Sequence, residues 1–221
     1  MGRSPMSLPP LSLVQTRVLG VLVEKEHTVP DIYPLSLNAL VSGCNQKNNR
    51  DPVLELTEAE VQAALDELRR RSLVIESSGS RVMRYEQNVG RVLKVPSQAV
   101  ALLAVLFLRG PQTAGELRIG TERMHKFADI SSVEAFLEEL ATRPETQGGA
   151  LLVKLPRRPG ERENRWAHLL SGPVAAPQYP DTVAVDATSG GDIERLAAEV
   201  AALREEVAAL RDELRRVAPP R

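Results

Sequence analysis

Two segments of this sequence carry side chains that could contact nucleic acid. The first is a polar run consisting of Asn45, Gln46, Lys47, Asn48, Asn49 and Arg50. Asn and Gln amides pair with adenine edges in the major groove of DNA, so this run is a candidate binding loop. Asn side chains also form turns with their own backbone, and a purely structural role is therefore the alternative.

The second segment is basic. It consists of Lys154, Arg157, Arg158, Arg162 and Arg165, arranged around a Pro159-Gly160 turn. Only Glu161 and Glu163 are acidic between these positions, which leaves a local charge of +3. A basic hairpin of this kind could lie against a phosphate backbone or, equally, against an acidic protein.

Residues that would support catalysis are sparse. His27, His125 and His168 are far apart in the sequence, and none has a metal-ligand spacing such as HExxH. Cys44 is the only cysteine and follows an apolar stretch, which is more typical of a small packed side chain than of a nucleophile. The sequence therefore predicts no catalytic residue, no metal site and no cofactor, and a non-enzymatic protein.

The elements that would position the two segments occur twice along the chain. An apolar stripe with the i, i+3, i+4, i+7 spacing of one helix face runs from Val61 to Leu68 and returns 72 residues later, from Val133 to Leu140. We expect helices at 11–26, 35–41, from 57 onward, 97–108, 113–119 and 131–142, and strands at 73–76, 82–86, 151–155 and 166–170. Thr57 and Glu60 have the spacing of a capping box at the start of the third helix.

A three-helix unit closed by a β-hairpin is typical of a winged helix. The sequence therefore predicts an α+β, mostly helical fold, with two tandem winged-helix domains followed by a C-terminal coiled-coil helix. The expected divisions are a flexible N-terminus at 1–10, winged-helix domains at 11–92 and 93–172, a Pro- and Gly-rich linker at 173–191, the coiled-coil helix at 192–217 and a tail at 218–221.

The predicted coiled coil has an uninterrupted heptad seam. Its a and d positions are Ile193, Leu196, Val200, Leu203, Val207, Leu210, Leu214 and Val217. Mostly β-branched residues at a and mostly Leu at d favour two parallel strands, and this pairing sets Glu199 against Arg204 and Glu206 against Arg211 of the partner helix. The pattern favours a homodimer; the alternative is that this helix folds back onto its own domains.

Charge argues against the usual mode of DNA recognition. The formal net charge is -1 and the pI is about 6.4, so contact with a polyanion requires a local basic patch. The helix that would enter the major groove exposes carboxylates in both predicted domains, among them Glu58 and Glu60 in the first and Glu134 and Glu138 in the second. Carboxylates repel phosphates, so we expect neither helix to read bases.

The same composition bears on location. A single cysteine excludes an intrachain disulfide, as is usual for proteins of a reducing cytoplasm. The longest apolar stretch, Val100 to Leu108, is too short to cross a bilayer, and the first ten residues do not resemble a signal peptide. We therefore expect a cytoplasmic protein without a membrane span.

Three segments of the sequence resemble a known family. They are the stretch from Tyr33 to Val53, which includes Cys44-Asn45-Gln46-Lys47-Asn48-Asn49-Arg50-Asp51-Pro52-Val53, the stretch from Leu108 to Arg118, and Arg158 to Glu163 with His168 and Leu169. Together they are similar to the YceH-like family of uncharacterised bacterial proteins, over about residues 11–172. The resemblance implies a bacterial origin and a tandem winged-helix fold. It implies no activity and no catalytic residues.

These observations favour a DNA-binding regulatory protein that uses helix-turn-helix units of the winged type. Its basic hairpin would lie on phosphates, and the 45–50 loop would lie near the bases. The alternative is a protein-protein scaffold whose winged helices are interaction modules. An enzyme is the remote alternative.

The heptad seam generates one prediction. The full chain should sediment as a dimer at micromolar concentration, whereas a chain that ends at residue 191 should sediment as a monomer, because the seam residues are buried only between two helices. Analytical ultracentrifugation of both chains measures this, and a monomeric full chain would contradict the dimer.

Overall fold

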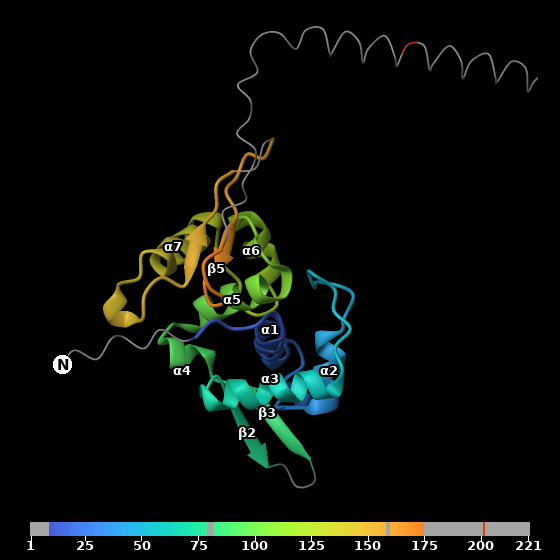
Figure 1. Cartoon of the computed structure of the whole chain (residues 1–221). Helices are drawn as coiled ribbons and strands as arrows, with labels where there is room; N and C mark the ends of the chain where they lie inside the picture. Colours follow the sequence, from blue (N-terminus) through green and yellow to red (C-terminus); the bar gives the residue numbers. More distant parts are fainter. Residues whose placement is uncertain (1–8, 79–81, 158–159, 175–200, 202–221) are drawn as a thin grey trace, which may run out of the picture. The chain divides into compact units, whose positions relative to one another are not determined.

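The computed structural model describes residues 9–78, 82–157, 160–174 and 201. About half of these residues are helical (Figure 1). The α-helices are α1 (Leu13–Thr28), α2 (Leu37–Cys44), α3 (Glu58–Arg70), α4 (Val89–Leu93), α5 (Ser97–Arg109), α6 (Ala114–Thr121) and α7 (Ile130–Ala141). Two short 3-10 helices are η1 (Pro30–Ile32) and η2 (Glu145–Gln147). The strands are β1 (Leu35–Ser36), β2 (Val74–Ser78), β3 (Met83–Gln87), β4 (Leu152–Lys154) and β5 (Trp166–His168).

The first half of the described chain, residues 11–92, ends in a small antiparallel sheet. Its strand order is β1-β3-β2. Val74 pairs with Gln87 across the hairpin, and Leu35 pairs with Tyr85 on the other edge of β3. The short segment between η1 and α2 is thus hydrogen-bonded to the last strand of its own half.

The second half, residues 93–172, repeats this order of elements. After α5, α6 and α7, strand β4 pairs antiparallel with β5, with Val153 opposite Ala167. A single bridge joins Gln112, between α5 and α6, to Trp166 in β5. This bridge is the counterpart of the β1–β3 pairing. Both predicted ribbons, after Leu68 and after Leu140, are therefore present.

Several helices begin at polar residues that satisfy backbone N–H groups. Thr57 and Glu60 form the predicted capping box at α3, and Ser12 with Gln15 does the same at α1. Ser36, Thr113 and Asp129 accept a backbone hydrogen bond at the starts of α2, α6 and α7. Such residues reduce the cost of starting a helix, which explains why most helix starts were predicted to within a few residues.

Helix α1 lies in the middle of the described residues, with α3 on one side and α5 on the other (Figure 1). All residues from Gln15 to Val23 of α1 are buried, so burial extends around the whole circumference of the helix over this stretch. A helix that is buried all round needs packing partners on all sides. α1 finds them in both halves, so one continuous core joins the two ribbon-closed units.

Two glycines permit this close packing. A methyl group at residue 20 would lie 2.8 Å from Cγ of Leu108 in α5, and one at residue 43 would lie 2.6 Å from Cγ1 of Val21. Both separations are too short for carbon atoms. Gly20 therefore allows α1 to approach α5, and Gly43 allows α2 to approach α1.

Three features differ from the sequence prediction. Leu35 and Ser36 form a strand and a helix cap, so the helix expected at 35–41 starts two residues later and extends to Cys44. Helix α4 was not expected, and it crosses the predicted domain boundary between residues 92 and 93. The mostly helical content was also an overestimate, because loops occupy much of the described chain.

Other predictions stay predictions. The residues proposed for the coiled-coil seam, all eight of them, lie outside the described residues, as do most of the predicted linker, the C-terminal tail and residues 1–8. The described residues between 9 and 174 form one compact unit. The division of these residues into two winged-helix domains therefore remains an interpretation of the repeat. No helix among the described residues is long and apolar enough to cross a membrane.

Candidate binding surface

The 45–50 loop is held by three of its own side chains. Asn45 donates from Nδ2 to the Leu56 carbonyl (2.8 Å) and accepts from the Leu56 N–H at Oδ1 (2.7 Å). Gln46 Oε1 accepts a hydrogen bond from Arg50 Nη2 at 2.9 Å. These contacts are within the protein. The amide groups of Asn45 and Gln46, which were predicted to pair with bases, are therefore engaged in holding the loop.

Arg50 is the anchor of this loop. Its side chain has no solvent exposure, and its Nη1 forms an ion pair with Glu24 Oε2 of α1 at 2.8 Å. Its Nε and Nη2 donate to the Gly43 carbonyl. A buried guanidinium needs both a counter-charge and filled hydrogen bonds, and Arg50 has both. It is therefore not available to a ligand.

A second buried arginine lies next to Arg50. Arg17 is fully buried in α1 and donates to the carbonyls of Cys44 (3.1 Å) and Pro52 (2.6 Å). It has no ion-pair partner among the described residues, and its Nε has no hydrogen-bond partner there. Burial, and then the neighbouring positive charge of Arg50, lower the pKa of Arg17. The two arginines thus tie α1 to both ends of the 45–52 segment.

Burial also determines the chemistry of Cys44. Its side chain is fully buried at the end of α2, and this burial raises the pKa of the thiol to about 12, although Arg17 and Arg50 act in the opposite direction. The thiolate is the reactive form of cysteine. Cys44 is therefore a packed, protonated side chain near neutral pH, as its position after an apolar helix predicted.

The exposed part of the loop faces the second half of the chain. Lys47 and Asn48 are exposed, and Asn49, which has a positive φ of 59°, accepts a hydrogen bond from Arg109 Nη2 at 2.8 Å. The Asp51 N–H donates to the Leu108 carbonyl at 2.8 Å. The loop is therefore fixed against the C-terminal end of α5.

The basic hairpin is anchored by two of its five cations. Arg165 forms ion pairs with Glu116 of α6 (2.8 Å) and with Glu161 (3.2 Å). Lys154 pairs with Glu138 of α7 at 2.9 Å and lies 5.0 Å from the centre of the Trp166 ring. Arg157 and Arg162 are exposed and form no ion pair among the described residues, and Arg158 lies outside them. Only part of the predicted charge is thus available at the surface.

The structure brings the two candidate segments to opposite ends of α6. Arg165 contacts Glu116 in the first turn of α6, and Nη1 of Arg109, which holds the loop, lies 3.7 Å from where a methyl group on Gly120 would be. Within α6, Ile119 is 72% exposed, and Arg118 is exposed on the opposite side of the helix from Glu116 and Gly120, toward the Ala128 carbonyl. We use the name α6 face for the residues of this region taken together, on α6 and on the segments that adjoin it: Lys47, Asn48, Arg109, Arg118, Ile119, Arg157 and Arg162.

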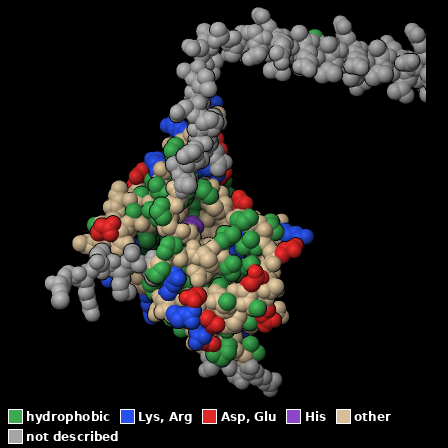
Figure 2. Space-filling model, viewed as in Figure 1, with side chains coloured by type: hydrophobic (Ala, Val, Ile, Leu, Met, Phe, Trp, Pro, Cys, Tyr) green, Lys and Arg blue, Asp and Glu red, His purple; other side chains and the backbone are tan. Residues whose placement is uncertain are grey.

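The third helices expose carboxylates, as predicted, and on α3 some of them form ion pairs. Arg69 pairs with Asp66 and with Glu76 of β2, and Arg70 pairs with Glu67. On α7, Glu134 and Glu139 are exposed. On the face drawn in Figure 2, basic and acidic side chains are intermixed, with no large area of one sign. This distribution agrees with the net charge of -1.

The three histidines are not brought together in a metal site. No group of three or more His, Cys, Asp or Glu side chains among the described residues could hold a metal ion. His168 packs edge-on against Phe107, with ring centres 4.9 Å apart, and burial lowers its pKa to about 4. His125 packs similarly against Phe127. Both contacts are those of core-packed rings.

Sequence reasoning missed Arg109 and Arg118 on the α6 face. Arg109 ends the apolar α5, and only the fold places its guanidinium beside a loop sixty residues earlier. Arg118 lies one residue before Ile119, which is the most exposed of the large hydrophobic side chains among the described residues. In the sequence, the one sign of this surface was an isoleucine on the polar side of the helix predicted at 113–119.

Comparison with known proteins gives the family. A family model described as "Protein of unknown function, DUF480" matches residues 11–161 of this chain. A UPF0502 protein of Acidovorax sp. (strain JS42) is 58% identical over 202 residues, covering 88% of this chain and 90% of the relative. A UPF0502 protein of Dechloromonas aromatica is 60% identical, covering 89% and 91% of the two chains.

The chain belongs to the DUF480/UPF0502 family. A third member, the UPF0502 protein Mpe_A1449 of Methylibium petroleiphilum, is 62% identical over 192 residues and is covered over 80% of its length. The expectation of a bacterial family without an assigned activity is confirmed at this level. The YceH-like name remains a prediction.

The geometry of the loop generates one prediction. Asn45→Ala removes both hydrogen bonds to Leu56 and should lower the free energy of unfolding by about 1–3 kcal/mol, because two backbone groups lose their partners. Asn48→Ala is the matched control: its side chain is exposed, so the change should stay within about 0.5 kcal/mol. Urea denaturation measures both. Equal stability of the two variants would show that the Asn45 contacts do not hold the loop.

Proposed function

We propose that this protein is a non-enzymatic, DNA-binding regulatory protein built from two winged-helix repeats. The order of elements supports the winged-helix assignment, since each half has three helices followed by an antiparallel pair of strands. In each half the segment before the second helix pairs with the last strand. Helix-turn-helix units of this kind commonly present one helix and one ribbon to duplex DNA.

One observation carries the proposal: the loop and the basic hairpin, chosen independently from the sequence, both adjoin α6. Lys47, Arg118, Arg157 and Arg162 are exposed and have no ion-pair partner among the described residues. α6 has eight residues, so it is about 12 Å long at about 1.5 Å per residue. Cations on α6 and on the segments that adjoin its two ends can contact phosphates of one duplex.

The proposed contact is with the backbone and not with the bases. The third helices α3 and α7 expose carboxylates, which would repel phosphates in a groove. Of the amides in the polar loop, Asn45 and Gln46 hold the loop itself. Asn48 is left to reach a base edge. We therefore expect binding with little sequence preference, dominated by charge.

A dimer would make such weak contacts useful. If residues 192–217 pair as their heptads predict, two α6 faces belong to one particle. The second face then binds at a high effective concentration, which raises the overall affinity without any new contact.

A protein-protein scaffold is the second candidate, and the α3 surface favours it. Glu58, Glu60 and Ala63 are exposed in the first part of α3, and the Arg69 and Arg70 ion pairs are at its other end. Such a mixed surface is typical of protein contacts and unsuited to DNA. The two functions differ in their response to salt, because phosphate contacts release counterions and protein contacts do so much less.

Fluorescence anisotropy with a nonspecific 20-base-pair duplex tests the proposal. Four phosphate contacts predict an affinity that falls roughly a hundredfold between 50 and 200 mM salt. Arg157→Ala with Arg162→Ala should reduce the magnitude of the logarithmic salt slope by about 1.8, and Lys47→Ala with Arg118→Ala should do the same.

The matched control is Arg70→Ala with Arg91→Ala, which removes the same charge from exposed residues outside the α6 face. This control should bind like the unmodified chain. The proposal is wrong if the unmodified chain does not bind duplex at 50 mM salt, or if the control loses as much affinity as the α6-face variants. Absence of duplex binding would favour the scaffold.

A further inference from the structure

A cavity lies where the two halves of the chain meet, and none of its lining residues belongs to the α6 face. It has a volume of about 510 Å³, which is in the range of small-molecule sites. The end of α3, helix α4, the segment after α7 and the segments beside β4 and β5 all contribute to it. We call it the seam cavity.

One wall of the seam cavity is apolar. It consists of Val92, Leu93, Leu151, Leu169 and Leu170. Leu93 and Leu151 are buried members of the continuous core, and Val92 and Leu170 are partly buried against it. The wall is thus the edge of the hydrophobic core where it borders the cavity, and an apolar group in the cavity can pack against it.

Three cations from three different elements also line the seam cavity. Arg71 follows α3, Lys94 follows α4, and Arg143 lies two residues after α7. None of the three forms an ion pair within the described part of the chain. Tertiary structure, and not sequence proximity, brings these charges to one place.

The two arginines are held in position by the backbone. Arg143 Nη2 donates to the Leu93 carbonyl, and Arg71 Nη1 donates to the Pro9 carbonyl at 2.7 Å. Each contact uses one nitrogen of a guanidinium that has three, so further N–H groups can bind an anion. Lys94 is exposed and makes no hydrogen bond with the described residues.

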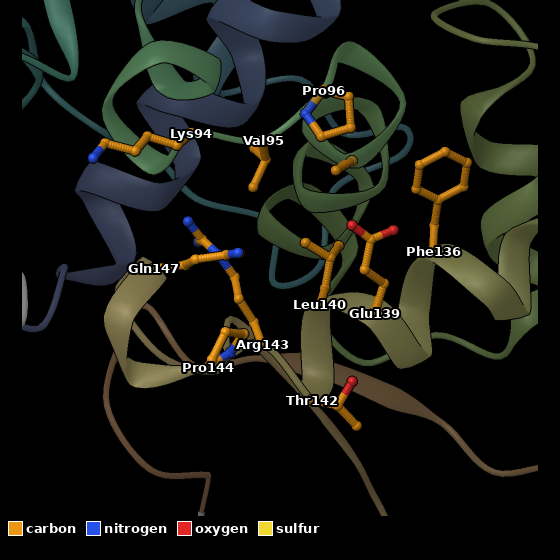
Figure 3. A pocket seen from close by; sticks show the side chains of 11 residues that line it. Lys94, Val95, Pro96, Phe136, Glu139, Leu140, Thr142, Arg143, Pro144 and Gln147 are labelled. Carbon is orange, nitrogen blue, oxygen red and sulfur yellow. The ribbon is translucent and has the colours of Figure 1, made fainter.

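A smaller hollow of about 240 Å³ adjoins the seam cavity and shares Lys94, Arg143 and Gln147 with it (Figure 3). In this view Arg143 lies between Lys94 on one side and Glu139 on the other. Glu145 is the one carboxylate that lines the seam cavity itself, and its Oε1 lies 3.1 Å from where a methyl group on Gly149 would be. Positive charge therefore predominates in the larger space.

We propose that the seam cavity binds an amphipathic anion, a phosphate or carboxylate attached to a small apolar group. The anion accepts charge-assisted hydrogen bonds from Arg71, Lys94 and Arg143, and the guanidinium geometry suits both oxyanions. The apolar group packs against the leucine wall. This site is independent of the DNA-binding proposal, since no residue is shared between them.

Isothermal titration calorimetry of the full chain with hexyl phosphate and with hexanoate tests the site and distinguishes the two head groups. At least one of them should bind saturably with one site per chain. Inorganic phosphate and hexanol should each bind at least tenfold more weakly, because phosphate lacks the apolar group and hexanol lacks the charge.

Lys94→Gln should weaken binding about tenfold, and Lys94→Gln with Arg71→Gln about a hundredfold, as each removes charged hydrogen bonds. Arg91→Gln is the matched control: it lies on α4, just before Lys94, and is exposed, but it lines a different cavity, so binding should be unchanged. Circular dichroism checks that every variant is folded.

The proposal is overturned by any of three results. One is the absence of saturable binding of both hexyl anions at millimolar concentration. Another is binding of hexanol as tight as that of the anions. The third is an equal loss of affinity in the Lys94→Gln and Arg91→Gln variants, because this would assign binding to general surface charge.

Discussion

The packing of α1 on all sides is the constraint on which the rest of the structure depends. Residues 15–23 are all buried and leave no face of this part of the helix for solvent, so α3 must cover one side and α5 another. Gly20 lets α5 come close to α1, and Gly43 lets α2 do the same. The two ribbon-closed halves therefore fold around one helix. The α6 face and the seam cavity are both products of this arrangement, because each is assembled from residues of both halves.

Two buried arginines connect the packing of α1 to the 45–52 segment at the surface. Arg17 of α1 binds the carbonyls on either side of the 45–52 segment, and Arg50 is clamped between Glu24 and the Gly43 carbonyl. Each buried guanidinium donates to backbone carbonyls, and Arg50 also has a counter-charge in Glu24, so these contacts hold the loop against α1. The part of the loop that remains open to solvent is small. Lys47 and Asn48 are exposed, and the adjacent Asn49 accepts a hydrogen bond from Arg109. The loop therefore connects α1 to its neighbours through its buried residues and leaves a few polar groups exposed.

Helix positions could be predicted because apolar periodicity and capping residues are local signals. The stripes at Val61–Leu68 and Val133–Leu140, and the Thr57 capping box, each depend on residues that lie within eight positions of one another in the sequence. The two-residue β1 and the five-residue α4 carry too little pattern, and tertiary contacts form them. For the candidate site, the sequence selected two segments by their chemistry but could not separate the roles of the residues within them. Asn45, Arg50, Lys154 and Arg165 are held in intramolecular contacts, a distinction that depends on Leu56, Glu24, Glu138 and Glu116 at distant positions.

The central claim, that both halves share one interior around α1, has a direct test. Trp166 is the only tryptophan and lies in β5 of the second half, whereas the backbone amides of α3 belong to the first. Urea unfolding of the full chain at fixed concentration can follow Trp166 fluorescence and the hydrogen exchange of the α3 amides in parallel. A shared core predicts that both signals report a single transition with the same midpoint. Loss of α3 protection at urea concentrations where Trp166 fluorescence is still native would contradict it.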